Sequence, residues 1–239
     1  MNGYNQSPFA NITPVVKNLL IINILFFIGT ITIGKFIPNV MEVLPAYYFN
    51  SSHFRLWEII TYMFMHAGIN HPEHILFNMF ALFSFGPILE YSLGPKKFLN
   101  LYFLCGIGAV ICHQLVQAYE VHAITGSITI SHPELISTFE GYGPLGQKLY
   151  DIYNTPVVGA SGAIFGLLAT FGLMFPNLEM MILFIPVPIK AKYIIPAYIV
   201  LELYLGFKQY QGDSVAHFAH LGGALIGFIM VKIWRLQHN

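Results

Sequence analysis

Apolar residues are grouped along the chain in six long stretches, separated by shorter polar segments. A helix needs ~20 apolar residues to cross the ~30 Å hydrocarbon core of a bilayer, and each stretch is close to that length. The pattern predicts an all-α, polytopic membrane protein in which six transmembrane helices form one domain over residues 1–239. The expected helices occupy residues 15–36, 74–93, 98–119, 156–175, 190–207 and 214–234.

The polar segments have distinct characters. Residues 1–14 form a short tail. The segment between the first two stretches is rich in aromatic side chains, which are typical of the lipid headgroup region, so we expect an interfacial loop there. Its aromatic residues are Tyr47, Tyr48, Phe49, Phe54 and Trp57. Residues 120–155 hold Gly, Ser, Thr and Pro without a long apolar run, and predict an extended aqueous loop with room for one short helix.

Composition agrees with the membrane interpretation. Only 9% of the residues are charged, against roughly 25% in an ordinary soluble domain. The formal net charge is zero and the basic residues form no large cluster, so we expect the lipid bilayer as a partner and no nucleic acid. Nothing in the sequence calls for a cofactor.

Lysine and arginine near the ends of the stretches predict the orientation, because cytoplasmic loops carry the excess of positive charge. With the N-terminus inside, seven basic residues fall on the cytoplasmic side: Lys17, Lys96, Lys97, Lys190, Lys192, Lys232 and Arg235. We therefore expect both termini in the cytoplasm of a bacterium, with the chain in its inner membrane. The loop 120–155 would then lie on the other side.

Polar side chains inside the apolar stretches are costly to bury and are therefore functional candidates. They form groups in the second, fourth and sixth stretches, while His113 and Glu202 stand alone and are given no chemical role. The grouped residues are His66, Asn70, His71, His74, Asn78, Ser161, His217 and His220. The histidines and Asn70 near the outer face also suggest a path for water.

Three of these groups are expected at one depth, since the second, fourth and sixth helices run in the same direction. At 1.5 Å per residue, Ser161 lies ~7 Å below Pro156, His220 ~10 Å below Asp213 and Asn78 ~9 Å below Pro72. Glycines spaced for close helix contact, Gly162 with Gly166 and Gly223 with Gly227, would bring the fourth and sixth helices together. Ser161 and His220 are then expected within hydrogen-bond reach.

A serine beside an imidazole can catalyse acyl transfer. The imidazole accepts the hydroxyl proton and then donates it to the leaving amine. The Asn78 amide, the His74 imidazole and the Ser161 backbone N–H are available to hold the oxyanion. Asp213 lies two helical turns from His220, too far to orient it. We expect a Ser161–His220 dyad without an acidic partner.

Two other chemistries use the same histidines. His71 with His74, or His217 with His220, could be a metal-binding pair, but the HExxH signature of zinc proteases is missing from the sequence and we expect no metal. A metal or proton transporter would need polar residues through to the opposite side. The inner halves of the three helices are almost entirely apolar, which disfavours that interpretation.

Several motifs together resemble the rhomboid family of intramembrane serine proteases. They are the runs GASGAIFG at residues 159–166, HILFN at 74–78, HLGG at 220–223, Trp57 with TYMFMH, GPILE at 86–90 with Gly94, and PVPIKAK at 186–192. The resemblance implies a six-helix fold that cleaves single-span, membrane-anchored proteins in or beside the membrane segment. It implies Ser161 as nucleophile, His220 as base, and His74, Asn78 and Gly159 at the oxyanion and substrate-binding site.

The sequence departs from the usual rhomboid pattern at three places. Glu58 follows the tryptophan where many members have arginine, His66 lies about three residues further from His74 than usual, and the loop 120–155 is long. A catalytically silent rhomboid-like protein that binds membrane clients is the alternative. Loss of the serine or the histidine would mark that class, and this chain has both Ser161 and His220.

Overall fold

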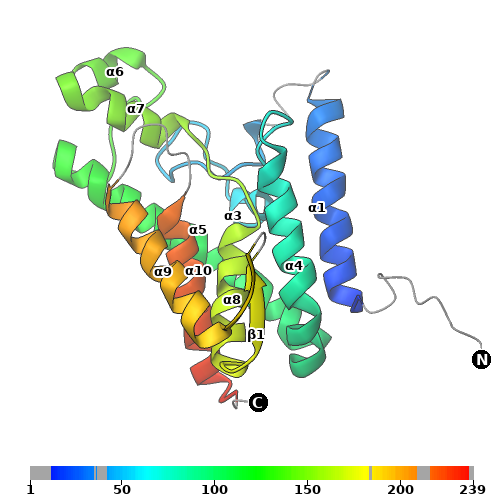
Figure 1. The fold of residues 1–239 in the computed structure, drawn as a ribbon. Helices are drawn as coiled ribbons and strands as arrows, with labels where there is room; N and C mark the ends of the chain where they lie inside the picture. The colour runs from blue at the N-terminus through cyan, green and yellow to red at the C-terminus, as the bar shows by residue number, and fades with distance from the viewer. Residues whose placement is uncertain (1–11, 35, 37–41, 183–184, 209–215, 237–239) are drawn as a thin grey trace, which may run out of the picture.

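In the computed structural model the chain is a bundle of helices standing side by side, with two short strands at one end (Figure 1). The structure describes residues 12–34, 36, 42–182, 185–208 and 216–236. Most of the expected tail 1–14, and Asp213, lie outside these described residues.

A helix is found at each of the positions that the hydrophobic pattern predicts. These are α1 Pro14–Ile33, α4 Pro72–Leu93, α5 Pro95–Thr125, α8 Ser161–Met174, α9 Ala191–Lys208 and α10 His217–Ile233. By length and composition α1, α4 and α5 can each cross a membrane, and α8 and α10 are shorter apolar helices. The chain is thus a helical, integral membrane protein, and the number of crossings stays a prediction.

Proline and glycine set the boundaries of the long helices. Pro72 is the first residue of α4, where its missing N–H costs nothing. Gly94 ends α4 with a φ of +79°, a conformation that residues with a Cβ rarely adopt, and Pro95 opens α5 directly after it. Gly126 ends α5 in the left-handed conformation of a helix C-cap.

The predicted interfacial segment holds only short helices, α3 Glu58–Thr61 and η1 Tyr62–Phe64. Neither is long enough to cross a bilayer. Glu58, the departure from the usual arginine, is fully buried, and its Oε2 accepts the Tyr47 N–H at 3.0 Å. The carboxylate therefore ties α3 to the segment that precedes it.

Residues 120–155 contain more helix than the sequence predicted. The first six continue α5, and the rest include α6 Ile136–Glu140, η2 Gly143–Leu145 and α7 Gly146–Asn154. Helices α6 and α7 contribute Phe139, Leu149 and Tyr153 to a small apolar cluster that also includes Tyr48. This part of the chain thus packs on the segment after α1, where Tyr48 Oη donates to the carbonyl of Ile128 at 2.7 Å.

The all-α expectation is wrong at one place. Residues Glu179–Ile182 (β1) and Ile185–Lys190 (β2) form an antiparallel hairpin between α8 and α9, with Glu179 opposite Lys190. β2 contains the proline pair of the PVPIKAK motif. Prolines cannot donate to a strand ladder, and a two-stranded hairpin has edges where they are tolerated.

Helix α8 lies in the centre of the bundle and packs closely on α10 (Figure 1). A Cβ built on Gly227 would lie 2.2 Å from the Gly166 carbonyl oxygen, so the two backbones are in contact. The predicted close approach of the two glycine-spaced faces is confirmed. It fixes the distance between the residues at the upper ends of α8 and α10.

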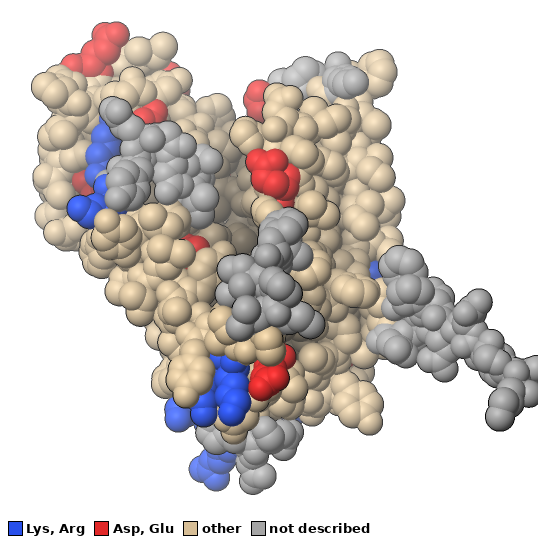
Figure 2. Space-filling view, in the orientation of Figure 1, with Lys and Arg blue, Asp and Glu red and all other residues tan. Residues whose placement is uncertain are grey.

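Charged side chains of both signs are visible toward both ends of the bundle, and the basic ones are gathered most densely at one end. Figure 2 shows basic side chains gathered at the end where the β1–β2 hairpin and the C-terminal end of α10 lie. Acidic side chains are visible at the opposite end, near α6. The surface is also hollowed between α9 and α4, above the hairpin.

Candidate active site

Ser161 and His220 lie in direct contact. The Ser161 hydroxyl is 2.8 Å from Nε2 of His220, and His220 is buried. Ser161 is the first residue of α8 and His220 lies in the first turn of α10. Since the facing glycines hold these two helices together, the predicted proximity of the two side chains is confirmed.

His220 also has an acidic partner, contrary to the expectation of a dyad without one. Its Nδ1 is 2.8 Å from Oε2 of Glu202, which lies on α9 and is buried. We expected no chemical role for Glu202, because it is an isolated polar residue in its apolar stretch. A signal was present, however, since α9 runs in the opposite direction and Glu202 lies six residues, or ~9 Å, from its end at Lys208. Counted from that end, its depth matches those of Ser161 and His220.

The same carboxylate oxygen binds a second imidazole. Nδ1 of His217 is 2.7 Å from Oε2 of Glu202, and both side chains are buried. The ligand atoms of Glu202, His217 and His220 lie within 4.8 Å of one another, a spacing that a divalent metal can bridge. Both Nδ1 atoms are, however, already hydrogen-bonded to the carboxylate.

Phe165 fixes the plane of the His220 ring. The two rings are stacked with their centroids 4.2 Å apart and their planes within 6° of parallel. Phe165 lies one turn after Ser161 on α8, so it faces the same neighbour. Sequence reasoning missed this residue, because a phenylalanine in an apolar helix carries no polar signal.

His74 lies on α4 and faces Ser161. Its Nδ1 accepts the Ala67 backbone N–H at 3.1 Å, so in the neutral ring the proton is on Nε2. A Cβ built on Gly159 would lie 3.0 Å from this Nε2 and 3.4 Å from the Ser161 hydroxyl. The donor nitrogen of His74 and the serine oxygen therefore border one small space, which Gly159 leaves open.

Gly159 has a φ of +127°, which favours glycine. Its N–H donates to the carbonyl of Tyr62 at 2.9 Å, and two residues earlier Val157 pairs with Ala46 through two backbone hydrogen bonds. The interfacial segment thus holds the chain that leads into Ser161. The first N–H groups of α8, including that of Ser161, have no partner within the helix and carry its positive dipole end.

Asn78 is buried one turn after His74 on α4, as predicted. Its amide donates to the carbonyl of His74 at 2.7 Å. One of its two N–H groups is therefore engaged within its own helix, and the other is available to a ligand.

The remaining histidines are distributed differently from the expected water path. His71 is exposed beside Glu73, its Nδ1 3.0 Å from the carboxylate. His66 is buried, with Nε2 2.9 Å from Oδ1 of Asn23. Burial, and secondarily the neighbouring His74, lowers the pKa of His66 to about 3, so this ring is neutral. His113 is partly buried on α5, and its Nδ1 has no hydrogen-bond partner among the described residues.

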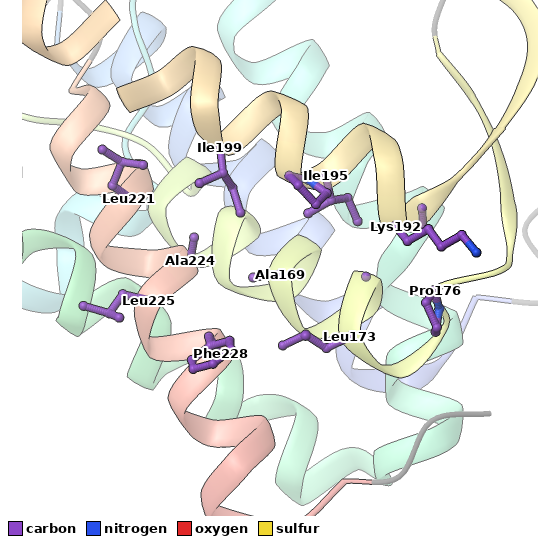
Figure 3. A pocket seen from close by; sticks show the side chains of 13 residues that line it. Ala169, Leu173, Pro176, Lys192, Ile195, Ile199, Leu221, Ala224, Leu225 and Phe228 are labelled. Carbon is purple, nitrogen blue, oxygen red and sulfur yellow. The ribbon is translucent and has the colours of Figure 1, made fainter. Parts of the chain in front are cut away.

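A cavity among the described residues lies away from Ser161. It has a volume of about 500 Å³ and lies between α8, α9 and α10, toward the β1–β2 hairpin (Figure 3). Its walls are almost wholly apolar, formed by residues such as Leu173, Ile195, Ile199, Leu225 and Phe228. It contains neither Ser161 nor His220 in its lining, so it is not the chemical site.

The family model and the relatives that match this chain are all rhomboid proteins. A sequence model described as the Rhomboid domain matches residues 53–236. The chain is 25% identical to YdcA of Bacillus subtilis, a candidate rhomboid protease, over 95% of this chain and 94% of YdcA. It is 30% identical to the rhomboid protease AarA of Providencia stuartii, over 73% of this chain and 54% of AarA.

A mitochondrial relative is similar to the same degree. The chain is 27% identical to a mitochondrial rhomboid protein of Schizosaccharomyces pombe, over 78% of this chain and 54% of that protein. It thus spans about half the length of several of these relatives. Because the relatives include both bacterial and mitochondrial proteins, they do not support the expected assignment to a bacterial inner membrane.

Proposed function

Because this chain belongs to the rhomboid family, we propose that it is an intramembrane serine endopeptidase with Ser161 as nucleophile and His220 as general base. The observation that carries the proposal is the 2.8 Å contact between the Ser161 hydroxyl and Nε2 of His220. An unactivated serine is a weak nucleophile, and a buried imidazole at this distance is what activates it.

The proposed reaction runs through an acyl-enzyme. His220 accepts the Ser161 proton as the hydroxyl attacks the scissile carbonyl, and then protonates the leaving amine. The proposed donors to the developing oxyanion are Nε2–H of His74, which borders the space beside Gly159, and the Ser161 backbone N–H, with Asn78 as a further donor. Water then attacks the acyl group with His220 again as base.

The proposed substrates are proteins anchored by a single transmembrane segment. Catalytic groups within apolar helices can reach only a chain that is itself in or beside the membrane. The hollow between α9 and α4 in Figure 2 offers such a chain a route from the lipid.

The proposed topology places α1, α4, α5, α8, α9 and α10 across the bilayer, in one domain. The ends of the bundle then lie as the positive-inside rule requires, with the basic end near the hairpin on the cytoplasmic side. In a mitochondrion the matrix takes the place of the cytoplasm. Both termini are proposed to lie on this basic side, and the α6–α7 region on the other.

Cleavage of a labelled single-span substrate in liposomes tests the function. Wild-type protein is expected to cleave it, and Ser161→Ala and His220→Ala are expected to fall to the background rate. Equal cleavage by wild type and Ser161→Ala would overturn the mechanism. Binding of the substrate without cleavage by any form would instead assign the chain to the client-binding class.

A further inference from the structure

A serine and a histidine are sufficient for the proposed reaction, and Glu202 is not needed to bring them together. The facing glycines of α8 and α10 already do so. Glu202 lies on a third helix, α9, among apolar neighbours in the sequence. The residue is only 4% exposed. A buried acid of this kind is costly unless its partners compensate, so its position requires an explanation.

Two other buried glutamates show what a structural role looks like in this fold. Glu90 accepts the backbone N–H groups of Val15 and Val16 and the Thr13 hydroxyl, and so caps the start of α1. Glu58 accepts the backbone N–H of Tyr47. Both satisfy backbone groups, whereas the hydrogen bonds of Glu202 go to imidazole side chains, one of them that of the general base.

The contact with Glu202 determines which nitrogen of His220 carries the proton. A carboxylate only accepts hydrogen bonds, so Nδ1 of His220 must be the donor. In the neutral ring Nε2 is then unprotonated and faces the Ser161 hydroxyl, which is the tautomer that a base requires. The carboxylate also lies beside the positive charge that forms on the ring when it takes the serine proton.

His217 holds the carboxylate in place. Its Nδ1 donates to the same oxygen at 2.7 Å, from one turn earlier on α10. The oxygen is therefore fixed between two imidazoles on one helix face, and Glu202 has little freedom to turn away from His220.

We propose that Glu202 is a positioning residue that completes a Ser161–His220–Glu202 triad, with His217 as the anchor of its carboxylate. The proposal rests on the proposed protease function. It concerns only the orientation and charge balance of the base, so its failure is separable from failure of the function.

Glu202→Gln is the central test, because the amide oxygen can still accept both Nδ1–H groups while the charge is removed. We expect kcat to fall by ~10- to 1,000-fold with little change in KM, since the charge matters only once the ring is protonated. Reaction of Ser161 with a fluorophosphonate probe is expected to slow by a similar factor. This second readout needs no substrate helix and reports activation of the serine itself.

Glu90→Gln is the matched control, since it neutralises a buried glutamate that has no contact with His220. It is expected to lower the unfolding temperature while the probe still labels Ser161 at the wild-type rate. At position 217, His217→Asn keeps an N–H near the carboxylate and is expected to retain more activity than His217→Ala. If Glu202→Gln does not fold, the difference in activity between His217→Asn and His217→Ala still tests the proposal.

The outcomes are distinct. Wild-type kcat and probe reactivity in folded Glu202→Gln would overturn the triad while leaving the protease function intact. If wild-type protein itself has no Ser161-dependent activity, it is the proposed function that fails. Loss of wild-type activity on chelation, with recovery on added zinc, would assign Glu202, His217 and His220 to a metal and would also overturn the triad.

Discussion

The backbone of Gly223 touches the carbonyl oxygen of Gly162 across the α8–α10 interface. A Cβ built on Gly223 would lie 1.8 Å from that oxygen. Any residue larger than glycine at this position would therefore force the two helices apart. Because Ser161 directly precedes Gly162, and His220 lies three residues before Gly223 on α10, the contact that sets the helix separation also sets the distance between Ser161 and His220.

Gly223→Ala is therefore expected to lower both stability and activity. Overpacking of a close interface costs typically about 1–3 kcal/mol, and the shift of α10 would lengthen the Ser161–His220 contact. Thermal unfolding in detergent and fluorophosphonate labelling measure the two effects. Gly29→Ala on α1 is the control, because nothing lies within 4 Å of a Cβ there, and it is expected to leave labelling unchanged without lowering stability. Normal labelling of Gly223→Ala would contradict the interface described here.

Gly159→Ala is expected to reduce kcat by ~10-fold or more, because its methyl group would enter the space between His74 and Ser161 that the oxyanion needs. The substitution also strains a backbone with a φ of +127°, at a cost of about 1–3 kcal/mol. Gly126→Ala separates the two effects, since Gly126 has a φ of +79° with open space around it. We expect that variant to be less stable yet active, and equal kcat in both variants would argue against the oxyanion site.

Phe165→Leu is expected to lower kcat several-fold while KM changes little, because leucine cannot stack on the His220 ring and the imidazole gains freedom to rotate. The smaller side chain also costs roughly 1 kcal/mol of stability at this buried site. Phe80→Leu, on an exposed face of α4, is the control for loss of a ring. Steady-state cleavage rates per folded molecule measure the effect, and an unchanged kcat in Phe165→Leu would show that the stack does not orient the base.

Glu58→Gln is expected to change the pH dependence of stability. Burial raises the pKa of the Glu58 carboxyl from 4.5 to about 6, against the weaker effect of the Tyr47 N–H. The folded protein thus binds this proton more tightly than the unfolded chain does. The resulting stabilisation is complete below about pH 4.5 and is lost as the pH rises through 6.

Glutamine has no proton to lose, so Glu58→Gln should gain stability relative to wild type as the pH rises over this range, by on the order of 2 kcal/mol. Unfolding in denaturant at a series of pH values measures the difference. Glu134→Gln removes an exposed carboxyl whose pKa is lowered, by its own backbone N–H and by His132, and is expected to show no such gain. A pH-independent difference between Glu58→Gln and wild type would show that Glu58 is not buried as described.

The sequence predicted the helices and the Ser161–His220 contact because both depend on regular spacing. Apolar runs define the helices, and the constant rise per residue gives the depth of each polar residue below the end of its helix. The β1–β2 hairpin was missed because its apolar residues continue the pattern of the neighbouring helices. Phe165 and the identity of the Glu202 partner were missed for another reason. Both depend on which faces of α8, α9 and α10 meet, and helix rotation is set by packing between segments far apart in the chain.

The cavity in Figure 3 lies along α9, on the half of that helix that does not carry Glu202. Ser161 and His220, the proposed nucleophile and base, lie on the tightly packed helices α8 and α10, whereas Glu202 lies on a helix with about 500 Å³ of space beside it. A hydrophobic small molecule that fills this space and tilts α9 would withdraw the carboxylate from His220 without touching Ser161. Inhibition of the proposed protease activity therefore does not require an electrophile that competes with substrate.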